Sequence, residues 1–409
     1  MQVKKRELLA KIERHIPDKR HTIITGARQV GKTSLLRMLY RKMLEEGKKA
    51  FFISFEDIQI LQAINEHPDK IFHYVALPPK PLLEGEAEER LYLLIDEVQY
   101  AEDPTNFLKF LYDKYEANVK VVATGSSAFY IDQKFKDSLA GRKRIFNLLP
   151  LSFSEFLFFK DLESLREELA ILKTRPEYQS PHREALQWHF YEYLQYGGYP
   201  AIVLENDPLE KQFLLDELKN AYVRRDMLES GVAHEGKFYL LLQLLADQAG
   251  NLVNRNELAG TLQIDVKTVD NYLYILEKCY HIFLVRPFFR NLRKELTKMP
   301  KVYFNDLGLR NAFLNRFGEA FSRPDKGQLL ENYYFCQLRH IYGLDQIKFW
   351  RTADKQEIDF IVEESFGAGK ALEVKWKKDS FKPAKYAKFK GAYPDFELRC
   401  VDAEDFYLY

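Results

Sequence analysis

The sequence is poor in cysteine and contains no long hydrophobic run. Its three cysteines, Cys279, Cys336 and Cys400, are far apart and form no C-x-x-C pair, which gives no zinc site and is typical of a reducing compartment. No stretch of about 18 apolar residues occurs, so we expect no membrane-spanning helix. The charged start, MQVKKRELLAKIERHI, lacks the apolar core of a signal peptide. We therefore expect a cytoplasmic protein with no membrane partner.

An excess of charge is also absent. The chain has 61 basic and 60 acidic residues, a net charge of +1. This balance excludes the whole-chain basic signature of many nucleic-acid-binding proteins, so any such contact needs a local patch. The length of 409 residues, at roughly one domain per 150 residues, predicts two to four domains.

The first 150 residues alternate between apolar strands and helices. We expect strands at 21–25, 50–57, 91–97 and 120–127, and a helix over 32–47 that ends at a glycine. The strands read as continuous apolar runs, which is typical of parallel strands buried on both faces. This pattern predicts an α/β domain with helices on both sides of a parallel sheet.

A glycine-rich loop follows the first predicted strand. Its residues fit the pattern G-x-x-x-x-G-K-[ST], and we expect them, with the serine that follows, to bind ATP: Gly26, Ala27, Arg28, Gln29, Val30, Gly31, Lys32, Thr33 and Ser34. Glycines let backbone N–H groups approach phosphate oxygens, and the following helix points its positive end at them. In this reading Lys32 contacts the β- and γ-phosphates and Thr33 ligates Mg²⁺. The alternative is a chance match, which the flanking strand and helix disfavour.

An acid pair ends the strand predicted at 91–97. We expect Asp96 to hold Mg²⁺ and Glu97 to orient and deprotonate the attacking water. The alternative is an ordinary strand that ends in two surface acids.

Two further groups are candidates for sensing the γ-phosphate. Thr124 or Ser126 lies at the end of the strand predicted at 120–127, where a plain turn is the alternative. Arg142 could supply positive charge to a γ-phosphate in its own chain or in a neighbour, and a solvated basic turn is the alternative.

These motifs resemble the AAA-type ATPases of bacteria and archaea that carry a C-terminal domain of unknown function, DUF4143. The matching segments, in the family's order, are GARQVGKT (26–33), LLIDEVQ (93–99), TGSSA (124–128), LAGR (139–142), LPLSFSEFL (149–157), GGYP (197–200) and KVYFNDLGLRN (301–311). The resemblance covers almost the whole chain. It implies an AAA-like P-loop NTPase core followed by a winged helix, and it implies that Arg142 senses nucleotide. It does not define a substrate.

Residues 236–300 have the layout of a winged helix. Helices are expected at 237–250, 254–263 and 266–280, followed by two strands around a basic turn within 281–294. The basic residues after the third helix could contact phosphates of DNA: Arg286, Arg290, Arg293, Lys294, Lys298 and Lys301. The alternative is a structural module with a solvated charged face.

The C-terminal region places acids and a lysine in a pattern similar to the PD-(D/E)xK nuclease fold. Asp359 lies in one predicted strand, Glu373 and Lys375 in the next, and Glu331 in the preceding helix. Because side chains two residues apart share a strand face, the acids could hold Mg²⁺ beside the lysine. A catalytically silent remnant is the alternative.

The sequence therefore predicts four regions and one main function. We expect a P-loop AAA-like ATPase domain at 1–150, a helical region at 151–235, a winged helix at 236–300 and a small α/β nuclease-like domain at 301–409, with DUF4143 at about 205–375. The predicted function is an ATP- and Mg²⁺-dependent switch that acts on nucleic acid, with Mg²⁺-dependent nuclease activity left open. The alternative is a non-catalytic regulator, controlled by nucleotide, that binds DNA or a protein partner, including in a defence or toxin-antitoxin system. For either function, assembly of the chain into an oligomer is left open.

Overall fold

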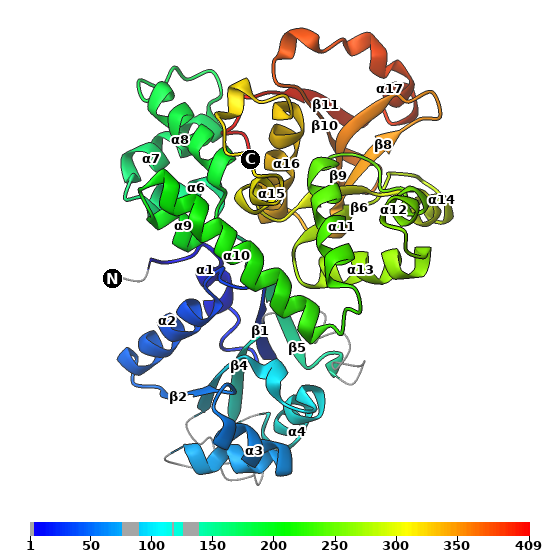
Figure 1. Ribbon diagram of the computed structural model, residues 1–409. Helices are drawn as coiled ribbons and strands as arrows, with labels where there is room; N and C mark the ends of the chain where they lie inside the picture. The colour runs from blue at the N-terminus through cyan, green and yellow to red at the C-terminus, as the bar shows by residue number, and fades with distance from the viewer. Residues whose placement is uncertain (1–3, 76–89, 117, 126–138) are drawn as a thin grey trace. The chain divides into compact units, whose positions relative to one another are not determined.

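The computed structural model describes residues 4–75, 90–116, 118–125 and 139–409, coloured along the chain in Figure 1. The chain divides into two compact units. Unit 1 comprises Met1–Leu149 with Lys278–Tyr280, and unit 2 comprises Pro150–Glu277 with His281–Tyr409. Within the described part of the chain, no helix combines the length and apolarity needed to cross a membrane.

Unit 1 is built on a five-stranded parallel sheet in the order β2-β3-β4-β1-β5. The strands are β1 (His21–Thr25), β2 (Lys49–Ser54), β3 (Leu91–Asp96), β4 (Val119–Gly125) and β5 (Lys143–Asn147). The strands predicted at 21–25, 50–57, 91–97 and 120–127 are therefore confirmed in their positions, although β2 ends at Ser54 and residues 126–127 lie outside the described residues. All residues of β1 and β4 are buried, as expected for central strands covered on both faces.

Helices cover both faces of this sheet. They are α1 (Leu8–Glu13), α2 (Lys32–Glu45), α3 (Ile58–Glu66) and α4 (Pro104–Tyr115). Ile23, Leu93 and Val121 project from one face and pack in one apolar cluster with α3 and α4. The helix α2 packs over β2, β3 and β4 through its own buried leucines and is not part of that cluster. Unit 1 is therefore an αβα sandwich, the fold class that the sequence predicted.

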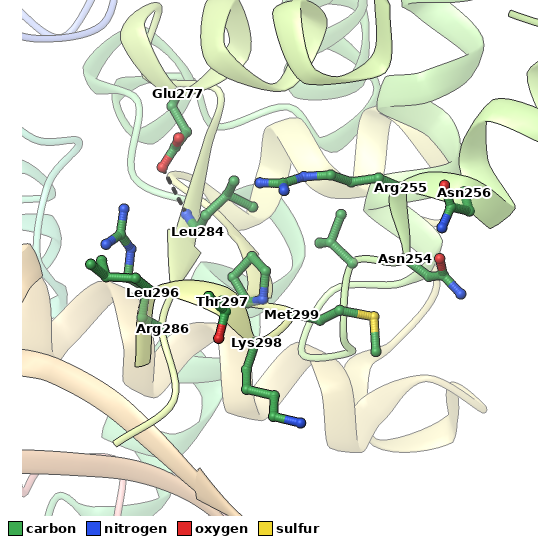
Figure 2. A pocket seen from close by; sticks show the side chains of 12 residues that line it. Asn254, Arg255, Asn256, Glu277, Leu284, Arg286, Leu296, Thr297, Lys298 and Met299 are labelled. Atoms are coloured by element: carbon green, nitrogen blue, oxygen red, sulfur yellow. Dashed lines mark hydrogen bonds between the residues drawn. The ribbon is translucent and has the colours of Figure 1, made fainter. Parts of the chain in front are cut away.

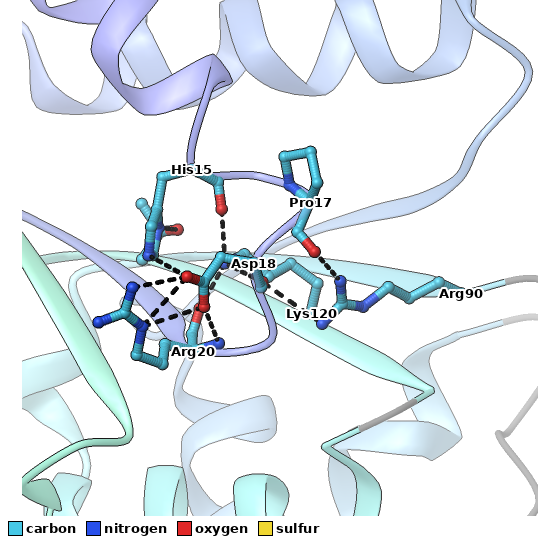
Figure 3. A network of polar contacts seen from close by, with 7 residues as sticks. His15, Pro17, Asp18, Arg20, Arg90 and Lys120 are labelled. Atoms are coloured by element: carbon cyan, nitrogen blue, oxygen red, sulfur yellow. Dashed lines mark hydrogen bonds and ion pairs between the residues drawn. The ribbon is translucent and has the colours of Figure 1, made fainter.

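A buried lysine ties the segment before β1 to the sheet (Figure 3). The Lys120 Nζ donates hydrogen bonds to the carbonyl oxygens of His15 at 3.2 Å, Asp18 at 2.9 Å and Arg20. Burial lowers the pKa of Lys120 to about 7. The Asp18 carboxylate in turn pairs with the Arg20 guanidinium. These bonds fix the start of β1. They therefore also fix the direction of the strand that leads into the following loop.

Unit 2 begins with a mostly helical region. Its helices are α6 (Phe153–Phe159), α7 (Glu163–Thr174), α8 (Arg183–Tyr196), α9 (Pro200–Leu204), α10 (Pro208–Glu229), α11 (Glu235–Asp247), α12 (Arg255–Leu262), α13 (Val266–Lys278), α14 (Leu292–Thr297), α15 (Leu307–Leu314) and α16 (Lys326–Ile341). The Ser152 side chain and Glu155 form a reciprocal capping box that starts α6. The Asp265 side chain accepts a hydrogen bond from the N–H of Thr268, as expected for a residue that caps α13.

A two-stranded antiparallel sheet follows the helices α11, α12 and α13. It consists of β6 (Ile282–Val285) and β7 (Lys301–Phe304). The prediction of two strands within 281–294 is therefore wrong in its second strand. Pro287 lacks the N–H that a continuing ladder needs, and α14 intervenes, with its first turn bonded to the Asn291 side chain. The pairing of β6 with β7 spans residue 300, where the sequence analysis expects a domain boundary.

The C-terminal part of unit 2 is a four-stranded sheet in the order β11-β10-β9-β8. Its elements are β8 (Ile347–Arg351), β9 (Glu357–Ser365), β10 (Ala368–Val374), α17 (Ala387–Ala392) and β11 (Phe396–Val401). The strand β9 is antiparallel to both of its neighbours, β8 and β10, and β11 runs parallel to β10. One face packs on α17 through Trp350, Ile361 and Phe389. This arrangement confirms a small α/β module at the C-terminus.

Candidate nucleotide-binding site

The loop between β1 and α2 has the backbone that a phosphate-binding loop needs. Gly26 has a φ of 150°, and a Cβ there would lie 2.1 Å from the carbonyl oxygen of Leu148, so only glycine fits. Gly31 has a φ of 99° and precedes the first turn of α2, which has no side-chain cap. The N–H groups of that turn point toward the loop, and the helix dipole favours an anion there.

The predicted phosphate-contacting lysine lies inside this loop. Lys32 is 5% exposed, and its Nζ donates hydrogen bonds to the carbonyl oxygens of Gly26 at 3.0 Å and Ala27 at 2.8 Å. The loop therefore wraps around the ammonium group. Arg28, Gln29 and Val30 complete the loop, and Thr33 and Ser34 belong to the first turn of α2.

The carboxylate of Asp96 connects α2 with the ends of β3 and β4. Its Oδ1 accepts hydrogen bonds from the Thr33 hydroxyl at 3.2 Å and from the Thr124 hydroxyl. Because β1, β3 and β4 are parallel neighbours in the sheet, their carboxyl ends meet at the same edge as the loop. The structure therefore brings together Thr33 and Asp96, which the sequence predicted as a magnesium site.

Glu97 follows in a left-handed backbone conformation, with φ 56° and ψ 51°. Such a conformation in a residue other than glycine costs about 1–3 kcal/mol and is concentrated at functional sites. The Glu97 N–H donates to the Thr124 hydroxyl at 3.0 Å, and the buried Gln99 amide donates to the Glu97 carboxylate. Both bonds fix the direction of the carboxylate, as expected of a group that must orient water.

Two buried side chains at this edge were not predicted from the sequence. One is Gln99. The other is Arg6, whose guanidinium donates to the carbonyl oxygens of Val30 and Leu149, both at 2.7 Å. Arg6 thus braces the phosphate loop against the chain that follows β5. Arg6 lies in the charged run KKRE, where no local pattern distinguishes it from a solvated residue.

The three predicted sensor residues have different outcomes. Thr124 lies at the site, where its hydroxyl donates to the Asp96 carboxylate. Ser126 lies outside the described residues. Arg142 precedes β5, where its carbonyl accepts from the His21 N–H at 2.8 Å and its side chain pairs with Asp113 at 2.7 Å. From His21 the strand β1 runs five residues, roughly 16 Å at about 3.3 Å per residue, before the loop starts. The structure does not bring Arg142 to the loop of its own chain, so only action on a neighbouring chain stays a prediction.

The site has the donor set that Mg²⁺ requires. Mg²⁺ prefers hard oxygen ligands and is usually held by one or two carboxylates or hydroxyls together with phosphate oxygens and water. The Thr33 hydroxyl and the Asp96 carboxylate supply two oxygens that already lie 3.2 Å apart. The residues of unit 1 therefore fit a magnesium-bound nucleotide.

The C-terminal carboxylates surround a lysine. Glu331 on α16 and Asp359 on β9 both accept hydrogen bonds from the Nζ of Lys301, at 2.9 and 3.2 Å. Glu373 on β10 pairs with Lys375 at 2.5 Å. Among the residues that the structure describes, no three acidic, histidine or cysteine side chains are arranged to hold a metal ion. The residues predicted as a nuclease site are thus close together, but in this structure they do not fit a magnesium ion.

Comparison with known families agrees with the motifs. The AAA domain family matches residues 18–157, the domain of unknown function DUF8612 matches 187–320, and the domain of unknown function DUF4143 matches 326–404. One region of the chain therefore matches the AAA domain family and a C-terminal region matches DUF4143, the combination of matches that the motifs predicted. The DUF4143 match starts later than the range of about 205–375 that the sequence suggested.

Similar proteins span most of the chain. An uncharacterized protein of Haemophilus influenzae is 28% identical over 84% of this chain and 79% of its own length. The uncharacterized protein MJ1637 of Methanocaldococcus jannaschii is 28% identical over 81% of this chain and 72% of its own. Among solved structures, the Aeropyrum pernix ORC2 protein in its ADP form is 13% identical, with 78% of this chain and 96% of that chain covered and a TM-score of 0.40.

Proposed function

We propose that unit 1 binds ATP with Mg²⁺ and hydrolyses it, and that the nucleotide state controls the activity of unit 2. The observation that carries this proposal is the chain of contacts at one sheet edge, in which Asp96 joins Thr33 of the phosphate loop to Thr124 beside Glu97. A surface acid pair without function would not need a buried aspartate bonded to two hydroxyls from different elements.

Each residue has a distinct role in this proposal. Gly26 and Gly31 let the backbone approach the phosphates, and the N–H groups of the first turn of α2 donate to phosphate oxygens. Lys32 exchanges its contacts with loop carbonyls for the β- and γ-phosphates. Thr33 and Asp96 hold the metal, which neutralises charge on the β- and γ-phosphates when bound. Glu97 accepts a proton from the attacking water.

Removal of the metal tests this assignment. Phosphate release from ATP, followed with purified protein in Mg²⁺, should fall about 100-fold or more in EDTA, because charge stabilisation by a metal contributes several kcal/mol. Re-addition of Mg²⁺ should restore the rate. Equal rates with and without divalent metal would contradict the roles of Thr33 and Asp96.

A second proposal concerns nucleic acid and the segment α11–β7, which we infer to be a winged helix. The support is a cavity of about 290 Å³ between the start of α12, the end of α13, β6 and the segment before β7 (Figure 2). Arg286 and Lys298 are exposed on its lining, together with Arg255, which also pairs with Asp270 at 2.7 Å. Exposed cations on both sides of a hollow suit a phosphate backbone.

Charge reversal distinguishes this proposal from a purely structural module. Arg286→Glu with Lys298→Glu should weaken filter binding of labelled DNA at least tenfold at low salt and reduce the dependence of binding on salt. Arg175→Glu is the matched control, because Arg175 is an exposed arginine at the end of α7. Unchanged DNA binding in the double variant, or no DNA binding by the natural chain with or without ATP, would favour the alternative of a regulator that binds a protein partner.

A further inference from the structure

The strongest unexplained feature of unit 2 is a buried lysine among carboxylates. Lys301 is the first residue of β7 and is 1% exposed. Its Nζ lies 2.9 Å from an oxygen of Glu331, 2.7 Å from one of Glu357 and 3.2 Å from one of Asp359. A lysine ammonium has three hydrogens to donate, and here three carboxylate oxygens from two elements accept them.

The acids converge on this ammonium because of where their elements place them. Glu357 and Asp359 are two residues apart on β9 and therefore share a face of the sheet. Glu331 projects from α16, and its Oε1 also accepts the hydroxyl of Tyr303, two residues after Lys301 on β7, at 2.6 Å. The second oxygen of Asp359 accepts the N–H of Val374 at 2.9 Å. The Oε1 of Glu331 and both oxygens of Asp359 are thus already engaged by Lys301, by the Tyr303 hydroxyl or by the backbone.

The backbone of Lys301 is held as firmly as its side chain. Lys301 pairs with Val285 in β6 and forms an isolated bridge with Leu252 on its other side. Gly250, with a φ of 83°, donates its N–H to Val302 at 2.8 Å, and a Cβ at Gly250 would lie 3.1 Å from the Glu331 carboxyl group. The Lys301 side chain therefore extends into the cluster from a residue of the paired strands β6 and β7, and not from a loop.

Electrostatics favour a cation at this position. Burial opposes the charged form of Lys301, but the neighbouring acids, Glu331 first, raise its pKa well above the usual value. Burial and the charge of Asp359 raise the pKa of Glu331 to about 7. Three close carboxylates without a cation would repel one another in a medium of low polarity, so the fold needs a positive charge here.

We propose that Lys301 is the resident cation of the Glu331–Glu357–Asp359 cluster and occupies the place that a divalent metal would take in a nuclease-like site. In this chain the cluster is then a structural ion network that joins the hairpin β6–β7 to α16 and β9. It binds no Mg²⁺ or Mn²⁺ while Lys301 is in place. Removal of the ammonium converts the same carboxylates into a site for one divalent ion.

Manganese binding tests this assignment directly. Free Mn²⁺ is followed by electron paramagnetic resonance during titration of the full chain without nucleotide, in the natural protein and in Lys301→Met. We expect Lys301→Met to bind one more Mn²⁺ per chain than the natural protein, and Mn²⁺ to raise its melting temperature by several degrees. Asp359→Asn added to Lys301→Met should abolish the extra ion. Lys348→Met is the matched control, because Lys348 lies on β8, the strand next to the one that carries Glu357 and Asp359, and pairs with Glu295 at 2.7 Å, outside the cluster.

Two outcomes would overturn the proposal. One is a Mn²⁺ ion bound by the natural chain and lost in Asp359→Asn alone, a comparison that remains informative if Lys301→Met does not fold. The other is a folded Lys301→Met protein, judged by circular dichroism, that binds no additional ion. Because the titrations contain no nucleotide, neither outcome depends on ATP hydrolysis by unit 1.

Discussion

Glu97→Gln should lower the rate of ATP hydrolysis about 10²–10⁴-fold, the usual contribution of a positioned general base, while ATP affinity changes by less than a few-fold. The amide has nearly the shape of the carboxylate but cannot accept a proton from water. The strained backbone at Glu97 and the bond from Gln99 show that this side chain is held in a fixed direction. A single-turnover measurement of phosphate release, with protein in excess over labelled ATP, separates this loss from a change in binding.

The matched control for this substitution is Glu102→Gln. Glu102 is exposed and follows the same strand end, and its backbone N–H donates to the Asn65 side chain at 3.1 Å. The control should hydrolyse ATP at the natural rate. If Glu97→Gln hydrolysed ATP at the rate of the natural chain, another group would have to activate the water. The role assigned to Glu97 would then be wrong.

Lys32→Ala should weaken ATP binding roughly 10²–10⁴-fold and remove hydrolysis with it. Hydrogen bonds to charged groups are worth about 1.5–3 kcal/mol each, and Lys32 is positioned to make two with the phosphates. In the structure the Lys32 ammonium donates hydrogen bonds to the carbonyl oxygens of Gly26 and Ala27. It therefore lies inside the loop that is proposed to bind the phosphates. Fluorescence titration with a labelled ATP analogue gives the affinities.

Lys42→Ala is the control on the same helix. Lys42 lies in the last turn of α2 and pairs with Glu13 at 2.7 Å on the surface, where solvent screens the interaction. Its affinity for ATP should match that of the natural chain. Equal affinity in Lys32→Ala would mean that the glycine-rich loop does not bind the phosphates.

The candidate nucleotide site could be proposed from the sequence because its signals are local. The loop 26–33 needs glycines at fixed spacing, and the acid pair Asp96–Glu97 ends an apolar strand, so both can be recognised without knowledge of distant contacts. The parallel sheet followed from continuous apolar runs for the same reason. The link from Thr33 through Asp96 to Thr124 agrees with the expected geometry.

The features that escaped prediction depend on contacts between distant residues. Arg6 reaches Val30 and Leu149, and Lys301 reaches acids up to 58 residues away, so neither has a pattern in its own neighbourhood. Lys301 was instead grouped with the basic residues expected to meet DNA, because a buried and an exposed lysine look the same in sequence. Arg142 was assigned from a motif, and only the strand order shows that it lies at the far end of β1 from the loop.

Calorimetric titration of the natural chain with ATP, in Mg²⁺ and again in EDTA, tests the central assignment most directly. The geometry at the ends of β1, β3 and β4 predicts saturable binding of one ATP per chain that is tighter in Mg²⁺. Absence of saturable binding by folded protein in Mg²⁺ would contradict it.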